Sequence, residues 1–269
     1  MAFGAPDPRL RTHVKGYCGY VESTSCPIVR VALPSPSVGL LVGFGPPVRI
    51  GYPVARAGPK VRVTSFVAGL HDSYAVVESA GWQQGVQVDL TPIGAHMLVG
   101  VPMSTLANQV VELGEVLGRC AARLVEQLGE TASWERRFGL IDALLATRLA
   151  AAREPSPAIS WAWRRLNESG GRLSVAALAA ELGSSRQYLV ARFREEIGLP
   201  PKTMARILRV QRAVRLLQRD REPRLAAIAR ECGYYDQAHL NRDFRQFAGS
   251  TPTEYLSRRL PGGAGVRYS

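Results

Sequence analysis

The sequence lacks any long apolar run. No stretch of roughly 18 apolar residues is present, and "VGLLVGF" (residues 38–44) is too short to cross a bilayer. The first residues, "MAFGAPDPRLR", also lack the basic start and apolar core of a signal peptide. We therefore expect no membrane span and no export, and predict a cytoplasmic, nucleoid-associated protein.

Cysteine is scarce. The four cysteines, Cys18, Cys26, Cys120 and Cys232, have neither the paired spacing of a zinc site nor the arrangement of a disulfide framework. They are expected to be reduced thiols. The sequence predicts no metal, no cofactor and no catalytic residue.

Acidic side chains are the minority charge. Lys and Arg number 34 against 22 Asp and Glu, a net charge of +12. Residues 161–269 hold 20 basic and 10 acidic side chains, whereas residues 1–160 hold 14 and 12. The C-terminal part therefore carries nearly all the excess, which favours a polyanionic partner, with nucleic acid ahead of a membrane surface.

The chain changes character along its length. Short, Val-rich stretches separated by Gly and Pro predict strands up to about residue 100, and "LANQVVELGEVLGRCAARLVEQLG" and "SWERRFGLIDALLATRLAAAR" predict helices from about 104 to 152. "REPSPA" predicts a linker, followed by helices. The expected fold is a mixed α/β, β-rich N-terminal domain followed by an all-α domain. The expected division is 1–102 for effector binding, 103–153 as a helical connector suited to dimerisation, 158–260 as the helical domain and 261–269 as a flexible tail.

The basic part contains an internal repeat. "LAAELGSSRQYLVARFREEIGLPP", from Leu178, aligns with "IARECGYYDQAHLNRDFRQFAGSTP", from Ile228. The offset changes from 50 to 51 residues in the turn, which indicates one inserted residue. The matched pairs are Ala179 and Ala229, Gly183 and Gly233, Leu189 and Leu240, Phe193 and Phe244, Arg194 and Arg245, Gly198 and Gly249, and Pro201 and Pro252.

Each copy has the layout of a helix-turn-helix unit. The small Ala lets two helices cross closely, and the Gly after it suits a turn because it adopts a positive φ at little cost. Leu and Phe four residues apart share one face of the second helix and are expected to pack it on the core. Two such patterns in tandem predict two helix-turn-helix units rather than two unrelated helical hairpins.

The second copy has a polar face on its second helix. With Leu240 and Phe244 inward, a turn of about 100° per residue points four residues away from the core: Ala238, Asn241, Arg242 and Arg245. Asn and Gln suit adenine, Arg suits guanine, and a small apolar side chain suits a thymine methyl. Asp236 is expected to cap the helix, which leaves Gln237 in the first turn. The alternative is a solvated face in which Asp243 pairs with nearby arginines.

The segment "PKTMARILRVQRAVRLLQRD", Pro201 to Asp220, predicts one linker helix of about 28 Å. That length can hold two recognition helices near the roughly 34 Å repeat of the major groove. In "GSTPTEY", Thr251 and Glu254 predict a capping box whose helix start can hold a phosphate. The inward side of the linker helix is expected to consist of Met204, Ile207, Leu208, Val214 and Leu217. The phosphate candidates on the linker helix are Arg206, Arg209, Arg212, Arg215 and Arg219.

Residues from about 160 to 260 resemble the DNA-binding domain of AraC/XylS-type bacterial transcription regulators. The resemblance is carried by "IARECGYYDQAHLNRDFRQFAGSTPTEY" and by "LAAELGSSRQYLVARFREEIGLPP". It implies two helix-turn-helix units on a long helix, with recognition helices in adjacent major-groove segments of promoter DNA, and RNA polymerase as a partner. The positions that it assigns to base reading are Arg186, Gln187, Val190 and Ala191 in the first unit and Gln237, Ala238, Asn241 and Arg242 in the second.

The first unit departs from the family pattern. Members often carry Arg two residues after the Leu of the recognition helix, where this chain has Ala191 followed by Arg192. Gln187 lies three residues after Ser184, so it can alternatively close a capping box. Arg194, which matches Arg245, is expected to contact phosphate, as are Arg245 and Thr251.

The stretch "GVQVDLTPIGAHMLVGVPMSTLANQVVELGEVLG" resembles the sensory domain found ahead of this DNA-binding domain in some regulators. It implies binding of a small-molecule effector or formation of a homodimer. Two other readings stay open. One is an alkyl-accepting DNA-repair protein or another enzyme, for which Cys18, Cys26 and the pair His71–Asp72 are the candidates. The other is a redox or ligand sensor that acts mainly through protein contacts.

Overall fold

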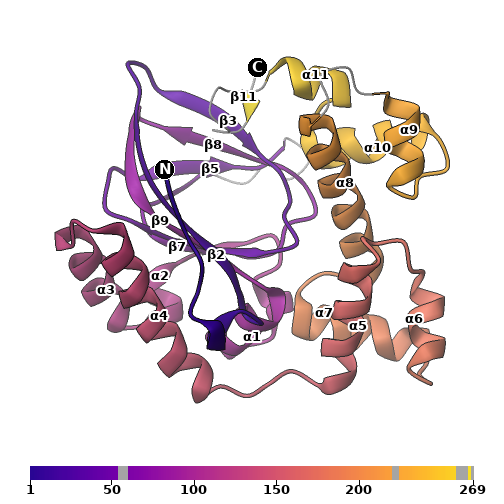
Figure 1. Ribbon diagram of the computed structural model, residues 1–269, viewed down its shortest axis with the longest axis horizontal. Helices are drawn as coiled ribbons and strands as arrows, with labels where there is room; N and C mark the ends of the chain where they lie inside the picture. The colour runs from indigo at the N-terminus through magenta and orange to yellow at the C-terminus, as the bar shows by residue number, and fades with distance from the viewer. Residues whose placement is uncertain (54–59, 220–223, 259–265, 268–269) are drawn as a thin grey trace.

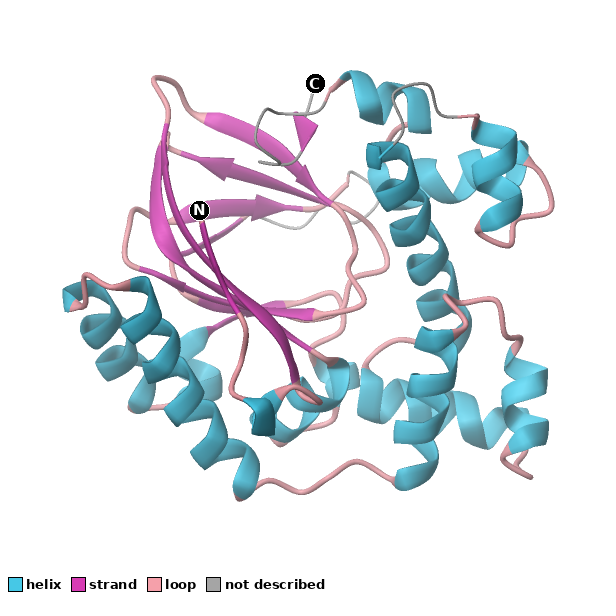
Figure 2. Ribbon diagram, viewed as in Figure 1, coloured by secondary structure: helices cyan, strands magenta, loops and turns pink. Residues whose placement is uncertain are grey.

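The computed structural model describes residues 1–53, 60–219, 224–258 and 266–267 of the 269-residue chain. It consists of a β-rich N-terminal domain and an all-helical C-terminal domain, joined by the loop that precedes Pro157 (Figures 1 and 2). This is the fold class that the sequence predicts. Within these residues, no helix combines the length and apolar character needed to cross a membrane.

The N-terminal domain contains two antiparallel sheets. The strands of the first, in spatial order, are β1 (Ala2–Gly4), β2 (Val14–Ser23), β9 (Trp82–Leu90), β4 (Val38–Gly43), β7 (Phe66–Ala68) and β10 (Val110–Glu112). Those of the second are β11 (Val266–Arg267), β3 (Ile28–Ala32), β8 (Ala75–Ser79), β5 (Val48–Gly51) and β6 (Val61–Val63).

One face of the first sheet is covered by helices (Figure 2). Alternate residues of neighbouring strands, such as Tyr17, Val42 and Val86, are buried on that face because side chains alternate along a strand. The helical elements that follow the strands or precede them are η1 (Pro8–Leu10), α1 (Pro92–Val99), η3 (Met103–Thr105), α2 (Leu113–Leu117), α3 (Cys120–Glu130) and α4 (Trp134–Ala150).

Helix α4 lies close against the edge of this sheet. Gly4 and Gly19 leave room for it: an added Cβ would lie 2.4 Å from the ring of Phe138 at the first position and 2.3 Å from that of Trp134 at the second. The hydroxyl of Tyr17 donates a hydrogen bond of 2.6 Å to Asp142 Oδ1, and the Tyr17 ring stacks on Phe138 with centroids 5.4 Å apart. The other face of the sheet turns toward the second sheet, where Ile50, Val63 and Phe66 form a separate apolar cluster.

Three local expectations differ from the structure. The stretch predicted to be helical from Leu106 contains strand β10, because Val110 to Glu112 pair with β7 and that pairing prevails over helix propensity. Helix α1 was not predicted; it starts at Pro92 behind the N-cap Thr91 and ends at Gly100 in the left-handed region. Of the tail at 261–269, Val266 and Arg267 form β11 rather than a frayed end, and the other residues lie outside the described chain.

The C-terminal domain contains seven described helices, of which α8 is the longest (Figure 1). They are α5 (Pro157–Glu168), α6 (Val175–Glu181), α7 (Arg186–Ile197), α8 (Pro201–Arg219), α9 (Leu225–Glu231), α10 (Gln237–Ala248) and α11 (Pro252–Ser257). Helix α8 ends at the last residue described before the gap at 220–223, so Asp220 lies outside the described residues.

The contact between α4 and the sheet makes a testable prediction. Replacing Phe138 with Ala removes a side chain that is 8% exposed, and is expected to lower the free energy of unfolding by about 3–5 kcal/mol, measured by urea denaturation. Phe3→Ala is the matched control, because Phe3 is 77% exposed and its loss is expected to cost less than about 0.5 kcal/mol. Equal losses for the two variants would contradict this packing.

Candidate nucleic-acid interface

The first helix-turn-helix unit comprises α6 and α7. Gly183 adopts φ 62° at the turn, as its sequence position predicts, and the buried side chains of Leu189 and Phe193 pack α7 on the core. The N-cap of α7 is Ser185, whose hydroxyl accepts a hydrogen bond of 3.1 Å from the backbone N–H of Tyr188. A capping box of Ser184 with Gln187 is therefore wrong: the cap lies one residue later, and Gln187 is exposed.

The second unit comprises α9 and α10. Gly233 adopts φ 78° at its turn, and Leu240 and Phe244 are fully buried. Asp236 is the N-cap, as predicted; its Oδ1 accepts a hydrogen bond of 2.7 Å from the backbone N–H of His239. The two units therefore reproduce the same frame with the one-residue insertion in the second turn.

The predicted base-reading residues lie on the outer faces of α7 and α10. Six of the eight are exposed, namely Arg186, Gln187, Ala191, Gln237, Ala238 and Arg242. Val190 and Asn241 are half-buried beside them. Each recognition helix thus presents amide, guanidinium and small apolar groups together, which is the set that major-groove edges accept.

Helix α8 joins the two units and is the best-buried helix of the domain. Its predicted inward residues, Met204, Ile207, Leu208, Val214 and Leu217, are each no more than 6% exposed. Such burial along 19 residues makes α8 a rigid rod between the units.

The arginines of α8 do not all face solvent. The Arg206 guanidinium donates to Asp243 Oδ1 of α10 through Nε at 3.1 Å and Nη2 at 2.7 Å, and Nη2 also donates to Gln246 Oε1 at 2.6 Å. The same guanidinium lies over the ring of Phe247, 4.9 Å from its centroid. The Asp243 side chain is only 3% exposed, so this ion pair joins α8 to the inner side of the second recognition helix.

Arg209 belongs to the same cluster. Its Nη2 lies 4.0 Å from Asp243 Oδ2, and its guanidinium lies over the ring of Tyr234 at 5.0 Å. Burial, together with the charge of Asp243, raises the pKa of the Tyr234 hydroxyl, which therefore stays protonated. Arg206 and Arg209 are thus half-buried, with 26% and 18% of their side chains exposed, and their guanidinium groups are directed at α10. Asp243 pairs with nearby arginines, as in the alternative, but it is buried and does not lie on a solvated face.

Thr251 is the N-cap of α11 and forms the predicted capping box. Its hydroxyl accepts from the backbone N–H of Glu254 at 3.3 Å, and its own backbone N–H donates to Glu254 Oε2 at 2.7 Å. That backbone hydrogen bond lowers the pKa of Glu254, so the carboxylate is ionised at the helix start. A phosphate at this end would meet a negative charge, and the geometry therefore does not favour a phosphate contact at Thr251.

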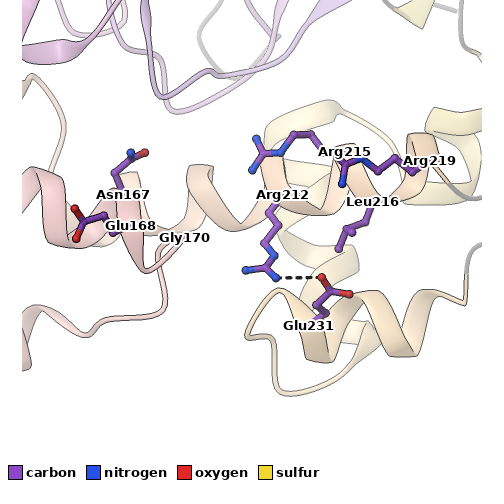
Figure 3. Close-up of a pocket in the computed structure, with 8 residues that line it drawn as sticks. All are labelled: Asn167, Glu168, Gly170, Arg212, Arg215, Leu216, Arg219 and Glu231. Atoms are coloured by element: carbon purple, nitrogen blue, oxygen red, sulfur yellow. Dashed lines mark hydrogen bonds and ion pairs between the residues drawn. The ribbon is translucent and has the colours of Figure 1, made fainter. Parts of the chain in front are cut away.

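A groove of about 280 Å³ lies along α8, between the end of α5 and helix α9 (Figure 3). Arg212, which lines it, donates to Glu231 Oε1 of α9 at 3.0 Å, and Arg215 and Arg219 extend the basic side along α8. Glu168 at the end of α5 adds a second carboxylate. The groove therefore has one more basic than acidic side chain.

The candidate residues of the enzyme and redox-sensor hypotheses are the cysteines and the pair His71–Asp72. All four cysteines are free thiols; burial raises the pKa of Cys18 and raises that of Cys232 to about 11, which disfavours the reactive thiolate. His71 stacks on Tyr52, and its two ring nitrogens contact the Tyr52 hydroxyl and the Gly69 carbonyl, both at 2.7 Å. Among the described residues no group of three or more His, Cys, Asp or Glu side chains has a metal-binding arrangement.

Comparison with known proteins also indicates a helix-turn-helix domain in the C-terminal part of the chain. Residues 178–258 match a helix-turn-helix domain model, and residues 4–112 match a domain of unknown function, DUF6597. A provisionally named AraC-like transcription regulator of Streptomyces antibioticus is 31% identical over 178 residues, which are 66% of this chain and 54% of that protein. The arabinose operon regulatory protein of Escherichia coli (strain K12) is 26% identical over 152 residues, 56% of this chain and 50% of that protein.

The chain thus spans about half the length of these two curated relatives. A solved structure of ToxT from Vibrio cholerae has the same fold, with a TM-score of 0.53 at 12% identity over 90% of this chain and 98% of that one. At this identity the likeness concerns the fold alone.

The cluster around Asp243 makes a testable prediction. Asp243→Ala leaves Arg206 and Arg209 without their carboxylate, and is expected to lower the free energy of unfolding by about 3 kcal/mol, measured by urea denaturation. Glu181→Ala is the matched control, because its pair with Arg165 is about 40% exposed on both sides and is expected to contribute less than about 1 kcal/mol. If both variants lose the same stability, the pair on α8 does not hold the recognition helix.

Proposed function

Because the chain belongs to the AraC/XylS-type family of bacterial regulators, we propose that it binds promoter DNA sequence-specifically through two helix-turn-helix units and regulates transcription. The N-terminal domain controls this binding. The observation that carries the proposal is the pair of equivalent exposed faces on α7 and α10, both held by the one buried helix α8. The basic excess of the C-terminal part supplies the non-specific attraction to the DNA backbone.

The roles divide between the two recognition helices and their flanks. Base edges are read by the residues named above on α7 and α10, with Arg242 suited to guanine and Gln237 and Asn241 to adenine. Arg194 and Arg245, which are exposed and occupy equivalent positions of the repeat, contact phosphates and set the register. Arg206 and Arg209 of α8 position α10 through Asp243, on the side of α10 that faces α8.

The N-terminal domain is proposed to bind a small-molecule effector between its sheets. The side chains between the sheets are apolar at one end, around Ile50 and Phe66. Others are polar: Arg30 of β3 pairs with Glu22 of β2 across the two sheets at 2.6 Å, and Gln87 donates to Asp89 at 2.7 Å. Side chains of this mixed character suit a ligand with both apolar and polar parts. ToxT, which shares the fold, has been solved with an unsaturated fatty acid bound.

The proposal includes three further elements. A contact with RNA polymerase converts promoter binding into regulation, and the exposed sides of α3 and α4 are available for a homodimer. Action at promoters places the chain in the bacterial cytoplasm, at the nucleoid. The raised pKa of the half-buried Cys18 thiol and the engaged ring nitrogens of His71 support a regulator rather than an enzyme.

A pair of arginine variants on α10 tests the reading of bases. A duplex is first selected from a random library with the full chain, and dissociation constants are then measured on that duplex and on random DNA. Arg242→Ala is expected to weaken binding to the selected duplex by about 1–3 kcal/mol and to relax the preference at one base pair. Arg245→Ala is expected to weaken binding to both DNAs alike and to reduce the salt dependence by about one phosphate contact.

The two arginines are matched, because both are exposed and lie on the same helix three residues apart. Equal losses on selected and random DNA for Arg242→Ala would assign it to the backbone and contradict its role in base reading. Failure of the full chain to enrich any duplex over random DNA would contradict the proposed function itself.

A further inference from the structure

The N-terminal domain contacts both recognition helices at the same position of the repeat. Gly198 ends α7 and Gly249 ends α10; they are matched residues, 51 apart, and both have positive φ, 112° and 68°. Both lie at the end of the helix away from its N-terminal turn, and both face residues of the N-terminal domain. The two contacts use different partners, so each is an independent feature of the chain.

The contact at the second unit is made by Tyr74, directly before β8. An added Cβ at Gly249 would lie 2.7 Å from Tyr74 Cζ and 2.8 Å from Cε1, so the hydroxyl-bearing edge of the ring lies close to the helix end, although Gly249 itself is exposed. The left-handed conformation of Gly249 brings the chain close enough for this contact and would strain any other residue. The end of α10 is thus approached by the edge of a half-buried ring of the other domain.

The contact at the first unit is made by Met103 in η3. An added Cβ at Gly198 would lie 3.2 Å from the Met103 carbonyl oxygen, and α7 also packs on α1. The buried Glu196 of α7 accepts a hydrogen bond of 2.8 Å from the backbone N–H of Ser156, at the start of the domain that follows the interdomain loop. The end of α7 is therefore fixed to the N-terminal domain and to the loop that leads out of it.

Further ties lie between these two points. Gln211 of α8 donates a hydrogen bond of 2.6 Å to the Pro34 carbonyl in the N-terminal domain. Beyond α11 the chain returns to the N-terminal domain, where β11 pairs with β3 and the backbone N–H of Arg267 donates to the Arg258 carbonyl at 2.9 Å. One continuous cluster of buried apolar residues includes Met103, Ile197 and Val266.

From these contacts we propose that the N-terminal domain sets the separation of the two recognition helices, with Tyr74 as a positioning residue for α10. The inference rests on the proposed function, because the separation matters only to a protein that reads two DNA segments. Helix α8 fixes where the two units are attached, and the contacts at Gly198 and Gly249 fix how far each recognition helix tilts from it. The N-terminal domain thereby determines which spacing of the two DNA segments is bound.

DNA geometry makes this constraint selective. One additional base pair between two major-groove segments moves the second by about 3.4 Å and rotates it by about 34° around the helix axis. A pair of recognition helices held rigidly follows such a change only by deforming the DNA. In a chain that lacks the Tyr74 contact, α10 tilts to meet the shifted groove.

The first experiment measures the separation without DNA. Spin labels at Gln187 and Gln237, on the exposed starts of α7 and α10, report the distance between the helices in the full chain after Cys18, Cys26 and Cys120 are replaced by serine. A single narrow distance distribution is expected for the chain with the native Tyr74 and for the control variant Tyr74→Phe, which keeps the ring. A broader distribution is expected for Tyr74→Ala and, to a smaller extent, for the milder variant Tyr74→Leu.

The second experiment measures spacing on DNA with unlabelled protein. The duplex selected by the full chain is lengthened by one base pair between its two contacted segments. Binding by the wild-type chain and by Tyr74→Phe is expected to weaken about tenfold or more, whereas Tyr74→Ala is expected to lose no more than about threefold. Circular dichroism shows that each variant is folded, and Tyr74→Leu replaces Tyr74→Ala if the latter is not.

The two experiments separate this inference from the proposed function. Unchanged distance distributions for Tyr74→Ala and Tyr74→Leu, or an unchanged spacing preference, would overturn the role of Tyr74 even if DNA binding is strong. A broadened distribution in a chain that selects no DNA would retain the structural role of Tyr74 and remove its purpose, which contradicts the proposed function and this inference with it.

Discussion

The two reading units depend on the burial of helix α8. Its apolar residues are enclosed along its length, and the ion pair between Arg206 and Asp243 joins its outer side to the second recognition helix. A helix that is exposed over most of its surface bends and frays, whereas one packed on several sides keeps a fixed length and direction. The relative placement of α7 and α10 therefore follows from side chains that never meet a ligand.

The two units share a frame but are anchored differently. The position of Asp243 in the second copy corresponds to Arg192 in the first, where the charge is reversed. Arg192 pairs with Glu195 and Glu196 on its own helix, at 2.7 and 2.6 Å, and Glu196 in turn contacts the start of α5. The second recognition helix is thus held by the linker helix, and the first by the segment that leaves the N-terminal domain. The N-terminal domain also contacts both helices directly, α7 through Met103 at Gly198 and α10 through Tyr74 at Gly249.

Much of the C-terminal domain could be predicted from the sequence because its determinants are local. Spacing alone predicted the repeat, the positive φ of Gly183 and Gly233, the cap at Asp236 and the box at Thr251. The ion pair of Arg206 could not be assigned in this way, because its partner lies 37 residues away on another helix. Pattern likewise failed for β10 and β11, short strands that exist through pairing with β7 and β3. The contacts at Gly198 and Gly249 join distant parts of the chain and leave no periodic signal.

The central claim is that two equivalent helices, held by one rod, enter successive major-groove segments on the same side of a duplex. Hydroxyl-radical footprinting of the full chain on its selected duplex tests this claim most directly. The account predicts two protected segments whose centres lie about 10 base pairs apart on one face of the helix. A single protected segment, or two on opposite faces, would contradict it.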